Sequence, residues 1–310
     1  MTDSDAVVRV RDLRKTYGTF TALDGVSFDI SRGETFALLG PNGAGKSTTI
    51  EILEGYRDRT GGEASVLGVD PRRGGIPWKA RLGIVLQNTG ESGDVTVHEQ
   101  LSHFAGYYSN PRNVDEVIAS VGLEDKSKTL IRKLSGGQRR RVDVALGIIG
   151  RPELLFLDEP TTGFDPEARR AFWDLITTLK GEGTTILLTT HYLDEAAHLS
   201  DRAGIIAGGK LIEIGSIDEI GGAEARVPIV RWKDSGGIRE RRTNQPGAVV
   251  ADLMKSGAEP DGLEIVRPSL EDVYLELVAA HEEESADGPS RTSGTGNGTS
   301  GTGNELENAK

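Results

Sequence analysis

The chain contains no cysteine among its 310 residues, which excludes disulfide frameworks, cysteine-ligated zinc, iron–sulfur clusters and thiol nucleophiles. Long apolar runs are also absent. The longest, residues 144–150, is seven residues long and includes two glycines, against the roughly 18–20 residues that a membrane-spanning helix needs. The N-terminus is acidic and lacks the basic and apolar regions of a secretory signal, so we expect the chain to stay in the cytoplasm.

Basic residues are outnumbered by acidic ones. The chain has 36 Lys and Arg against 48 Asp and Glu, which leaves a formal net charge of −12 at pH 7. Duplex binding depends on clustered Lys and Arg that neutralise phosphates, so we expect no nucleic-acid partner. With 36% hydrophobic and 27% charged residues, the composition is that of a globular chain with one large or two modest domains.

Residues 1–215 alternate strand patterns with helix patterns, which is typical of an α/β domain. Residues 7–10 and 25–30 indicate half-exposed antiparallel strands. Three later runs are nearly all apolar, as in strands covered on both faces, and a helical pattern follows each of them. We therefore predict a mostly parallel core sheet with crossover helices. The apolar runs are 36–39, 154–157 and 185–188, and the helical patterns are 45–53, 166–180 and 193–199.

The pattern weakens after residue 215. A strand at 227–232, a helix at 248–255 and a strand followed by a helix within 263–280 predict a small C-terminal α+β appendage over residues 216–281. Residues 282–310 are rich in Gly, Ser, Thr and Asn and contain no aromatic residue. Such a segment buries too little apolar area to offset its chain entropy, so we predict a flexible, disordered tail there.

A phosphate-binding loop (P-loop) is indicated at residues 40–48, directly after an apolar run and before a helical pattern. Its glycines allow backbone N–H groups to converge on an anion at the positive end of the following helix. Lys46 adds a charge at the β and γ phosphates, and the Ser47 hydroxyl suits Mg²⁺. The alternative is a glycine-rich turn with an exposed lysine. The residues expected to bind the nucleotide are Gly40, Pro41, Asn42, Gly43, Ala44, Gly45, Lys46, Ser47 and Thr48.

Two adjacent acids, Asp158 and Glu159, end the apolar run 154–157 and precede Pro160. Successive side chains of a strand point to opposite sides, so we expect the two carboxylates to have different roles. We assign Asp158 to the surroundings of Mg²⁺, and Glu159 to the water that attacks the γ-phosphate. In the alternative interpretation, both acids cap a strand in solvent.

A second anion site is indicated at residues 134–138, which open a long helical pattern. Ser135 is suited to cap that helix, and Gly136 and Gly137 leave N–H groups bare at its positive end. With these motifs the chain resembles the nucleotide-binding subunit of an ATP-binding-cassette (ABC) transporter. Residues 134–138, called here the signature segment, match the signature of that family. The resemblance covers residues 7–215 and implies the P-loop fold of an ABC ATPase, with an antiparallel β subdomain and a helical subdomain.

The resemblance implies a homodimer across two ATP molecules. Two chains face each other head to tail, and the P-loop of one and the signature segment of the other clamp each nucleotide. Residues 162–165, which include Asp165, match the loop that crosses the dimer interface. Phe164 stands where leucine is more usual, a change that we expect to do little harm. The signature residues implied in ATP binding are Ser135, Gly136, Gly137 and Gln138.

Three further residues receive roles from the resemblance. Tyr17 matches the aromatic residue that stacks on adenine, although by itself it reads equally well as a strand-edge tyrosine. Gln87 matches the glutamine that touches Mg²⁺ and the water, and it begins the segment that senses the membrane partner. His191 matches the histidine that contacts the γ-phosphate. The implied catalytic residues are therefore Glu159, His191 and Gln87, and the implied Mg²⁺ residues are Ser47, Gln87 and Asp158.

The arginine run 139–141, Asp143 and residues 268–277 resemble the branch of the family that includes daunorubicin-resistance ATPases and pairs with ABC-2-type permeases. The resemblance implies an ATP-hydrolysing subunit at the cytoplasmic face of the membrane. It would work with a separate permease and export drugs, lipids or other amphiphiles. The alternative is a soluble non-transport ABC ATPase or a regulatory nucleotide-binding module. Because Glu159 and His191 are both present, the sequence favours an active enzyme over a silent binder.

Overall fold

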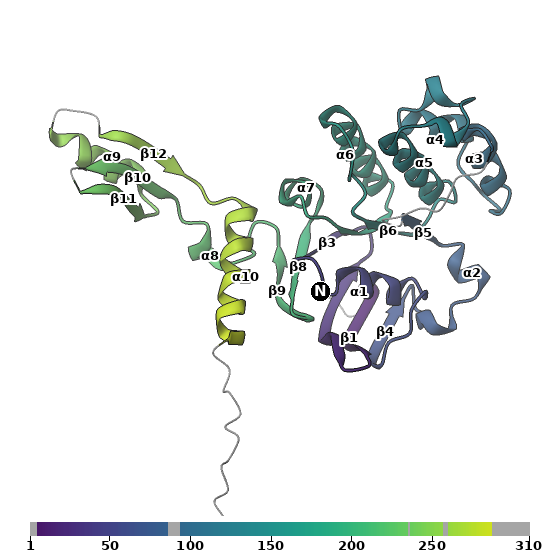
Figure 1. Cartoon of the computed structure of the whole chain (residues 1–310), viewed down its shortest axis with the longest axis horizontal. Coiled ribbons are helices and arrows are strands. Elements are labelled where there is room, and N and C mark those ends of the chain that lie inside the picture. The colour runs from purple at the N-terminus through teal and green to yellow at the C-terminus, as the bar shows by residue number, and fades with distance from the viewer. Residues whose placement is uncertain (1–4, 86–93, 235, 257–259, 287–310) are drawn as a thin grey trace, which may run out of the picture.

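A six-stranded sheet lies at the centre of the fold (Figure 1). The computed structural model describes residues 5–85, 94–234, 236–256 and 260–286. Five neighbouring strands are parallel and the sixth is antiparallel, so the predicted mostly parallel core is confirmed. In spatial order the strands are β5 (Leu82–Val85), β6 (Leu154–Asp158), β7 (Thr185–Thr189), β3 (Thr35–Leu39), β8 (Arg202–Ala207) and β9 (Lys210–Ser216).

A three-stranded antiparallel sheet packs on one face of this core sheet. Val10 of its middle strand pairs with Phe28 on one side and Ala64 on the other. All three share a hydrophobic core with Phe36 and Phe156 of the central sheet. The predicted antiparallel strands are therefore confirmed, and both extend further than predicted. In spatial order the strands are β2 (Phe20–Ser31), β1 (Ala6–Tyr17) and β4 (Gly61–Val66).

Helices cover both faces of the core sheet. α1 follows the P-loop and lies with the antiparallel sheet, whereas α6 and α7 pack on the opposite face (Figure 1). α3, α4 and α5 pack together as a helical subdomain beside β5. Among the residues that the structure describes, no helix is long and apolar enough to cross a membrane. The bounds are α1 (Lys46–Leu53), α2 (Ile76–Lys79), α3 (Val97–Ala105), α4 (Val114–Ser120), α5 (Gly136–Ile148), α6 (Pro166–Gly181) and α7 (Leu193–Leu199), with 3₁₀ turns at Pro71–Arg73, Glu124–Lys126, Ile131–Lys133 and Met254–Ser256.

Alternate side chains of the core strands enter two different cores. In β6, Leu155 and Leu157 face the core shared with α5 and α6, whereas Leu154 and Phe156 face the core shared with the antiparallel sheet. Every residue of β6 is buried. This two-sided burial is why the sequence shows an unbroken apolar run there and not an alternating one.

The C-terminal region is a small α+β unit, as predicted, with one strand that the sequence pattern missed. The residues of β11 are mostly charged and all of them are exposed, so the strand has no apolar alternation to reveal it. It pairs with the predicted strand β10, and β12 completes a three-stranded antiparallel sheet. The elements are α8 (Gly222–Ala225), β10 (Ile229–Asp234), β11 (Gly237–Arg242), α9 (Pro246–Leu253), β12 (Asp261–Val266) and α10 (Leu270–Ala286).

The last helix, α10, departs from the predicted boundaries. It continues to Ala286, past residue 282 where the tail was predicted to begin, and the rest of that tail lies outside the described residues. Leu270 and Val273 of α10 are buried in the same core as α7 and β8. The cassette and the helix that ends the appendage are therefore joined by a hydrophobic core.

We expect Leu270→Ala to lower the free energy of unfolding by about 2–5 kcal/mol, the range for deleting a buried leucine side chain. The matched control is Leu275→Ala on the same helix, where the side chain is 56% exposed and the change should stay within about 0.5 kcal/mol. Urea unfolding of both variants measures the difference. Equal, small effects would show that α10 does not contribute to the core of the cassette.

Candidate functional site

The P-loop occupies the turn between β3 and α1, where close backbone contacts require glycine. A Cβ atom on Gly40, whose φ is +155°, would lie 2.1 Å from the carbonyl oxygen of Ile206. A Cβ atom on Gly45, with φ at +111°, would lie 2.7 Å from the carbonyl oxygen of Ala22. Both are impossible contacts for a side chain, so the loop can hold its cradle shape only with glycine at these positions. Gly45 also begins α1, whose N–H groups point toward the loop.

Lys46 is the buried cation of this loop. Lys46 is 7% exposed, and Nζ donates hydrogen bonds to the carbonyls of Gly40 at 2.7 Å and Pro41 at 3.1 Å. Burial lowers the pKa of the Lys46 ammonium, and the neighbouring carboxylates of Glu159 and Asp158 act in the opposite direction. The ammonium is thus held in the loop between backbone carbonyls and two acids, where it can meet a phosphate.

An open cleft of about 650 Å³ surrounds the P-loop and brings distant segments of the chain together. Tyr17 reaches it from the end of β1, with the Nζ of Lys15 at 4.9 Å from the centre of its ring. Glu159 and His191 reach it from the ends of β6 and β7. Sequence reasoning missed Phe20, an exposed aromatic that pairs with Tyr17 across the β1–β2 turn. The lining residues are Tyr17, Phe20, Ala22, Asn42, Gly43, Gly45, Lys46, Ser47, Thr48, Glu159 and His191.

The two acids diverge for a reason other than the predicted one. β6 ends at Asp158, and Glu159 turns into the left-handed region with φ at +48°. The expectation that strand alternation separates the two carboxylates is therefore wrong, because the separation comes from this turn. The amide of Glu159 donates to the carbonyl of Thr189 at 3.1 Å, and the hydroxyl of Thr189 donates to the Asp158 carboxylate. Asp158 and Glu159 are thus both hydrogen-bonded to β7.

Glu159 lies at the mouth of the cleft, facing His191. Its carboxylate oxygen Oε2 is 3.5 Å from Nδ1 of His191, and the Glu159 side chain is only 15% exposed. Asp158 lies deeper, beside a buried acid that the sequence did not reveal, Glu54 at the end of α1. Burial raises the pKa of the Glu54 carboxyl to about 8, and the charges of Asp158 and Glu51 act in the same direction. The structure therefore places a second, buried carboxyl group next to Asp158.

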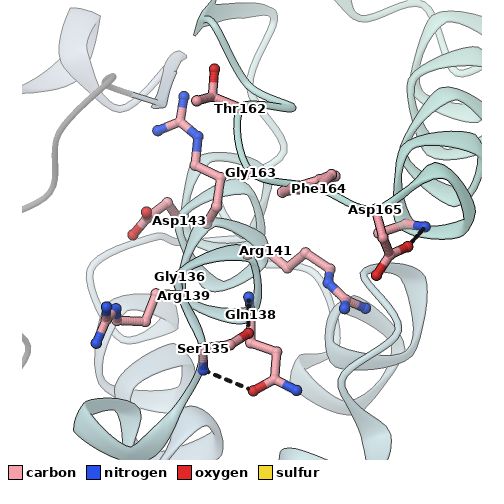
Figure 2. A pocket seen from close by; sticks show the side chains of 13 residues that line it. Ser135, Gly136, Gln138, Arg139, Arg141, Asp143, Thr162, Gly163, Phe164 and Asp165 are labelled. Carbon is pink, nitrogen blue, oxygen red and sulfur yellow. Dashed lines mark hydrogen bonds between the residues drawn. The ribbon is translucent and has the colours of Figure 1, made fainter.

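The signature segment forms a second pocket of about 540 Å³ (Figure 2). The hydroxyl of Ser135 accepts a hydrogen bond from the amide of Gln138, while the Gln138 side chain accepts one from the amide of Ser135. This capping box begins α5, with Ser135 as the N-cap that the sequence predicted. Asp165 lines the same pocket and caps α6 through the amide of Ala168. The lining residues are Ser135, Gly136, Gly137, Gln138, Arg139, Arg140, Arg141, Asp143, Thr162, Gly163, Phe164, Asp165 and Ala168.

Among the described residues, no side chain lines both pockets. The candidates that line neither are Gly40, Pro41 and Ala44, which belong to the loop itself, and Asp158, which lies beneath the cleft. Gln87 lies outside the described residues.

Phe164 packs edge-to-face on Phe172 of α6, with ring centres 6.0 Å apart, so it fills an apolar site.

The donor set at the P-loop suits Mg²⁺. Ser47 supplies a hydroxyl in the cleft and Asp158 a carboxylate below it, which are the hard oxygen donors that this ion prefers. Within the described part of the chain, no cluster of three or more His, Cys, Asp or Glu could hold a metal ion by itself. Mg²⁺ takes few protein ligands and completes its shell with water and nucleotide phosphates, so the oxygens of Ser47 and Asp158 suit it.

Comparisons with known proteins agree with this geometry. The profile of the ABC transporter family matches residues 23–162. A daunorubicin resistance ATP-binding protein of Streptomyces coeruleorubidus is 33% identical over 305 residues, which cover 88% of this chain and 96% of that protein. This chain belongs to the ABC transporter family. A fluoroquinolones export ATP-binding protein of Mycobacterium tuberculosis is 36% identical over 279 residues, covering 87% of this chain and 93% of that protein.

Solved structures show the same fold. An ATP-binding cassette in a dimeric post-hydrolysis state, bound to ADP and Pi, matches with a TM-score of 0.62 and 23% identity, covering 67% of this chain and 98% of that one. The predicted ABC ATPase fold and the resemblance to the daunorubicin-resistance branch are confirmed. The chain is an ATP-binding, ATP-hydrolysing subunit of an ABC transporter. Proteins of this family dimerise and work with transmembrane partners.

Proposed function

We propose that this ABC subunit drives an ABC-2-type exporter of drugs, lipids or other amphiphiles from the cytoplasmic face of the membrane. The ATPase cassette occupies residues 1–215, and the appendage follows it. Two chains form a homodimer around two ATP molecules and act on a separate permease subunit. Support for the cargo class comes from the relatives, which are named for daunorubicin resistance and fluoroquinolone export.

The separation of the two pockets carries this proposal. The P-loop cleft is lined by residues of 17–22, 42–48, Glu159 and His191, and the signature segment contributes to another pocket. Both pockets have bare backbone N–H groups at the start of a helix, so each suits phosphate. A nucleotide in the cleft therefore leaves the signature segment of its own chain unused. A second chain, related by a two-fold axis, supplies the missing half of each site.

The residues of the cleft divide the work of hydrolysis. Tyr17 offers a ring for the adenine, and the P-loop amides with Lys46 hold the phosphates. Glu159 accepts a proton from the attacking water, and His191, 3.5 Å from it, contacts the γ-phosphate and keeps the carboxylate oriented. Ser135 of the facing chain closes the site. Mg²⁺, when bound near Ser47 and Asp158, neutralises charge on the phosphates.

Transport follows from closure. Two chains that share the γ-phosphate are held together by it, and its removal releases them. We assign residues 97–108, which include α3, to the surface that moves against the permease, because this stretch lies in the helical subdomain and follows the segment that begins at Gln87. Closure of the dimer then switches the permease to its outward-facing conformation.

We expect the tagged chain to copurify with a polytopic membrane protein, and its ATPase rate to change severalfold when membranes carrying that permease are added. The rate is measured by phosphate release with permease-containing membranes and with membranes that lack the permease. Lys46→Ala is the control, since the phosphate-release rate of this variant should be the same with both kinds of membrane. An unchanged rate and no membrane partner would favour a soluble non-transport ATPase instead.

A further inference from the structure

Three consecutive arginines follow the signature segment, and the structure gives them different environments. Arg139 is exposed and Arg141 is half-buried, whereas Arg140 is 93% removed from solvent. Arg140 extends from α5 toward the end of β6. Its Nε donates to the carbonyl of Pro160 at 3.1 Å, and its Nη2 donates to the carbonyls of Asp158 at 2.5 Å and Glu159 at 3.1 Å.

These carbonyls belong to the turn that places Glu159. The strand ends at Asp158, so the turn leaves the sheet and its carbonyls need donors from elsewhere. The left-handed conformation of Glu159, with φ at +48°, is unfavourable for a residue with a side chain, and it persists only where its surroundings enforce it. Thr189 holds the amide of Glu159 on one side, and Arg140 holds the carbonyls on the other.

Arg140 also lies on the helix that Ser135 caps. It follows Ser135 by little more than one helical turn, so the signature segment and the guanidinium belong to one rigid element. α5 is thus bonded at its first turns to the strand end that carries the catalytic acid of the same chain. In the dimer proposed above, this α5 contacts one nucleotide through Ser135, while Glu159 acts on the other.

We propose that Arg140 is a positioning residue for hydrolysis, which holds the 158–160 turn so that the Glu159 carboxylate faces the cleft, and which links that turn to the signature helix. This inference rests on the proposed role of Glu159 as the base. It predicts that loss of Arg140 misplaces the carboxylate and leaves the P-loop intact, because the three carbonyls that Arg140 holds belong to residues 158–160.

Arg140→Met keeps the length of the side chain and removes its donors. We expect kcat to fall about 10–100-fold, the range for a misplacement of about 1 Å, with the Kd for ATP unchanged within about threefold. Arg140→Lys restores one donor and should recover part of the rate. The matched control is Arg132→Met, because Arg132 is exposed and forms an ion pair with the exposed Asp94, and its kcat should equal that of the wild type.

A double-mutant cycle separates positioning from a general structural role. If Arg140 acts through Glu159, adding Arg140→Met to Glu159→Gln should lower the residual rate by less than twofold. A further 10–100-fold loss, or a weaker Kd with an unchanged kcat, would overturn the proposal. If Arg140→Met does not fold, as judged by its melting curve, the same cycle with Arg140→Lys decides. If Glu159→Gln alone keeps full activity, the assignment of the base fails, whereas full activity in the Arg140 variants alone refutes only this inference.

Discussion

Glu159→Gln is expected to lower the rate of ATP hydrolysis by about 10²–10⁴-fold, the range for loss of a general base. The amide has the shape of the carboxylate but cannot accept the proton of the attacking water. The P-loop residues that hold the phosphates are untouched, so ATP binding should remain. Single-turnover phosphate release and ATP titration measure the two effects separately.

The same variant should accumulate an ATP-bound dimer, because the γ-phosphate that joins the chains is no longer removed. The absence of native cysteine makes this simple to test. Chains carrying Asn42→Cys are mixed with chains carrying Ser135→Cys, both in the Glu159→Gln background, and oxidised with and without ATP. We expect a covalent dimer only with ATP. In the control, chains with Asn42→Cys are mixed with chains that carry Ser102→Cys, at an exposed position of α3, in place of Ser135→Cys. This mixture should form no covalent dimer.

Glu116→Gln is the matched control for activity, since Glu116 is an exposed acid on α4 and its loss should leave the rate unchanged. Normal turnover in Glu159→Gln would remove Glu159 from the mechanism. Failure to crosslink despite saturating ATP would instead contradict the head-to-tail dimer. The two results are independent, so the experiment distinguishes an error in the chemistry from an error in the assembly.

Lys46→Ala should weaken ATP binding about 10–100-fold, the effect of losing about 1.5–3 kcal/mol of charged hydrogen bonding. The reason is that Lys46 is the buried cation of the P-loop, and it contributes to the ground state as well as to the transition state. The rate of ATP hydrolysis at subsaturating ATP should fall by at least the same factor. Isothermal titration with ATP gives the affinity directly.

Lys46 also holds the carbonyls of Gly40 and Pro41, so its removal has a structural component. Lys46→Met, which fills most of the volume, and Lys46→Arg, which keeps the charge, separate the two components. The control is Lys79→Ala on the exposed side of α2. Wild-type affinity in both Lys46→Ala and Lys46→Met would show that the loop amides alone bind the phosphates.

The sequence was most informative where burial is two-sided or glycine is required. Unbroken apolar runs predict the β3, β6 and β7 strands, and the residue type of Ser135 predicts the helix cap there. Such features depend on local physics, so they can be read without the fold.

The parts that the sequence did not reveal depend on tertiary contacts. Nothing in the arginine run distinguishes buried Arg140 from exposed Arg139, because the difference lies in the carbonyls that the 158–160 turn presents. β11 was missed since its residues are exposed and charged. The turn at Glu159 was misread as strand because its left-handed backbone is enforced by Thr189 and Arg140, which are distant in sequence.

The two-sided burial of β6 has a consequence for how the molecule can come apart. Neighbouring side chains of β6 belong to the two hydrophobic cores on opposite faces of the sheet. Neither layer can therefore separate from β6 without exposing apolar side chains. Local unfolding of one layer would expose the apolar surface of the other layer to water. The two layers are therefore thermodynamically coupled, and unfolding of either one also destabilises the backbone that carries Asp158 and Glu159.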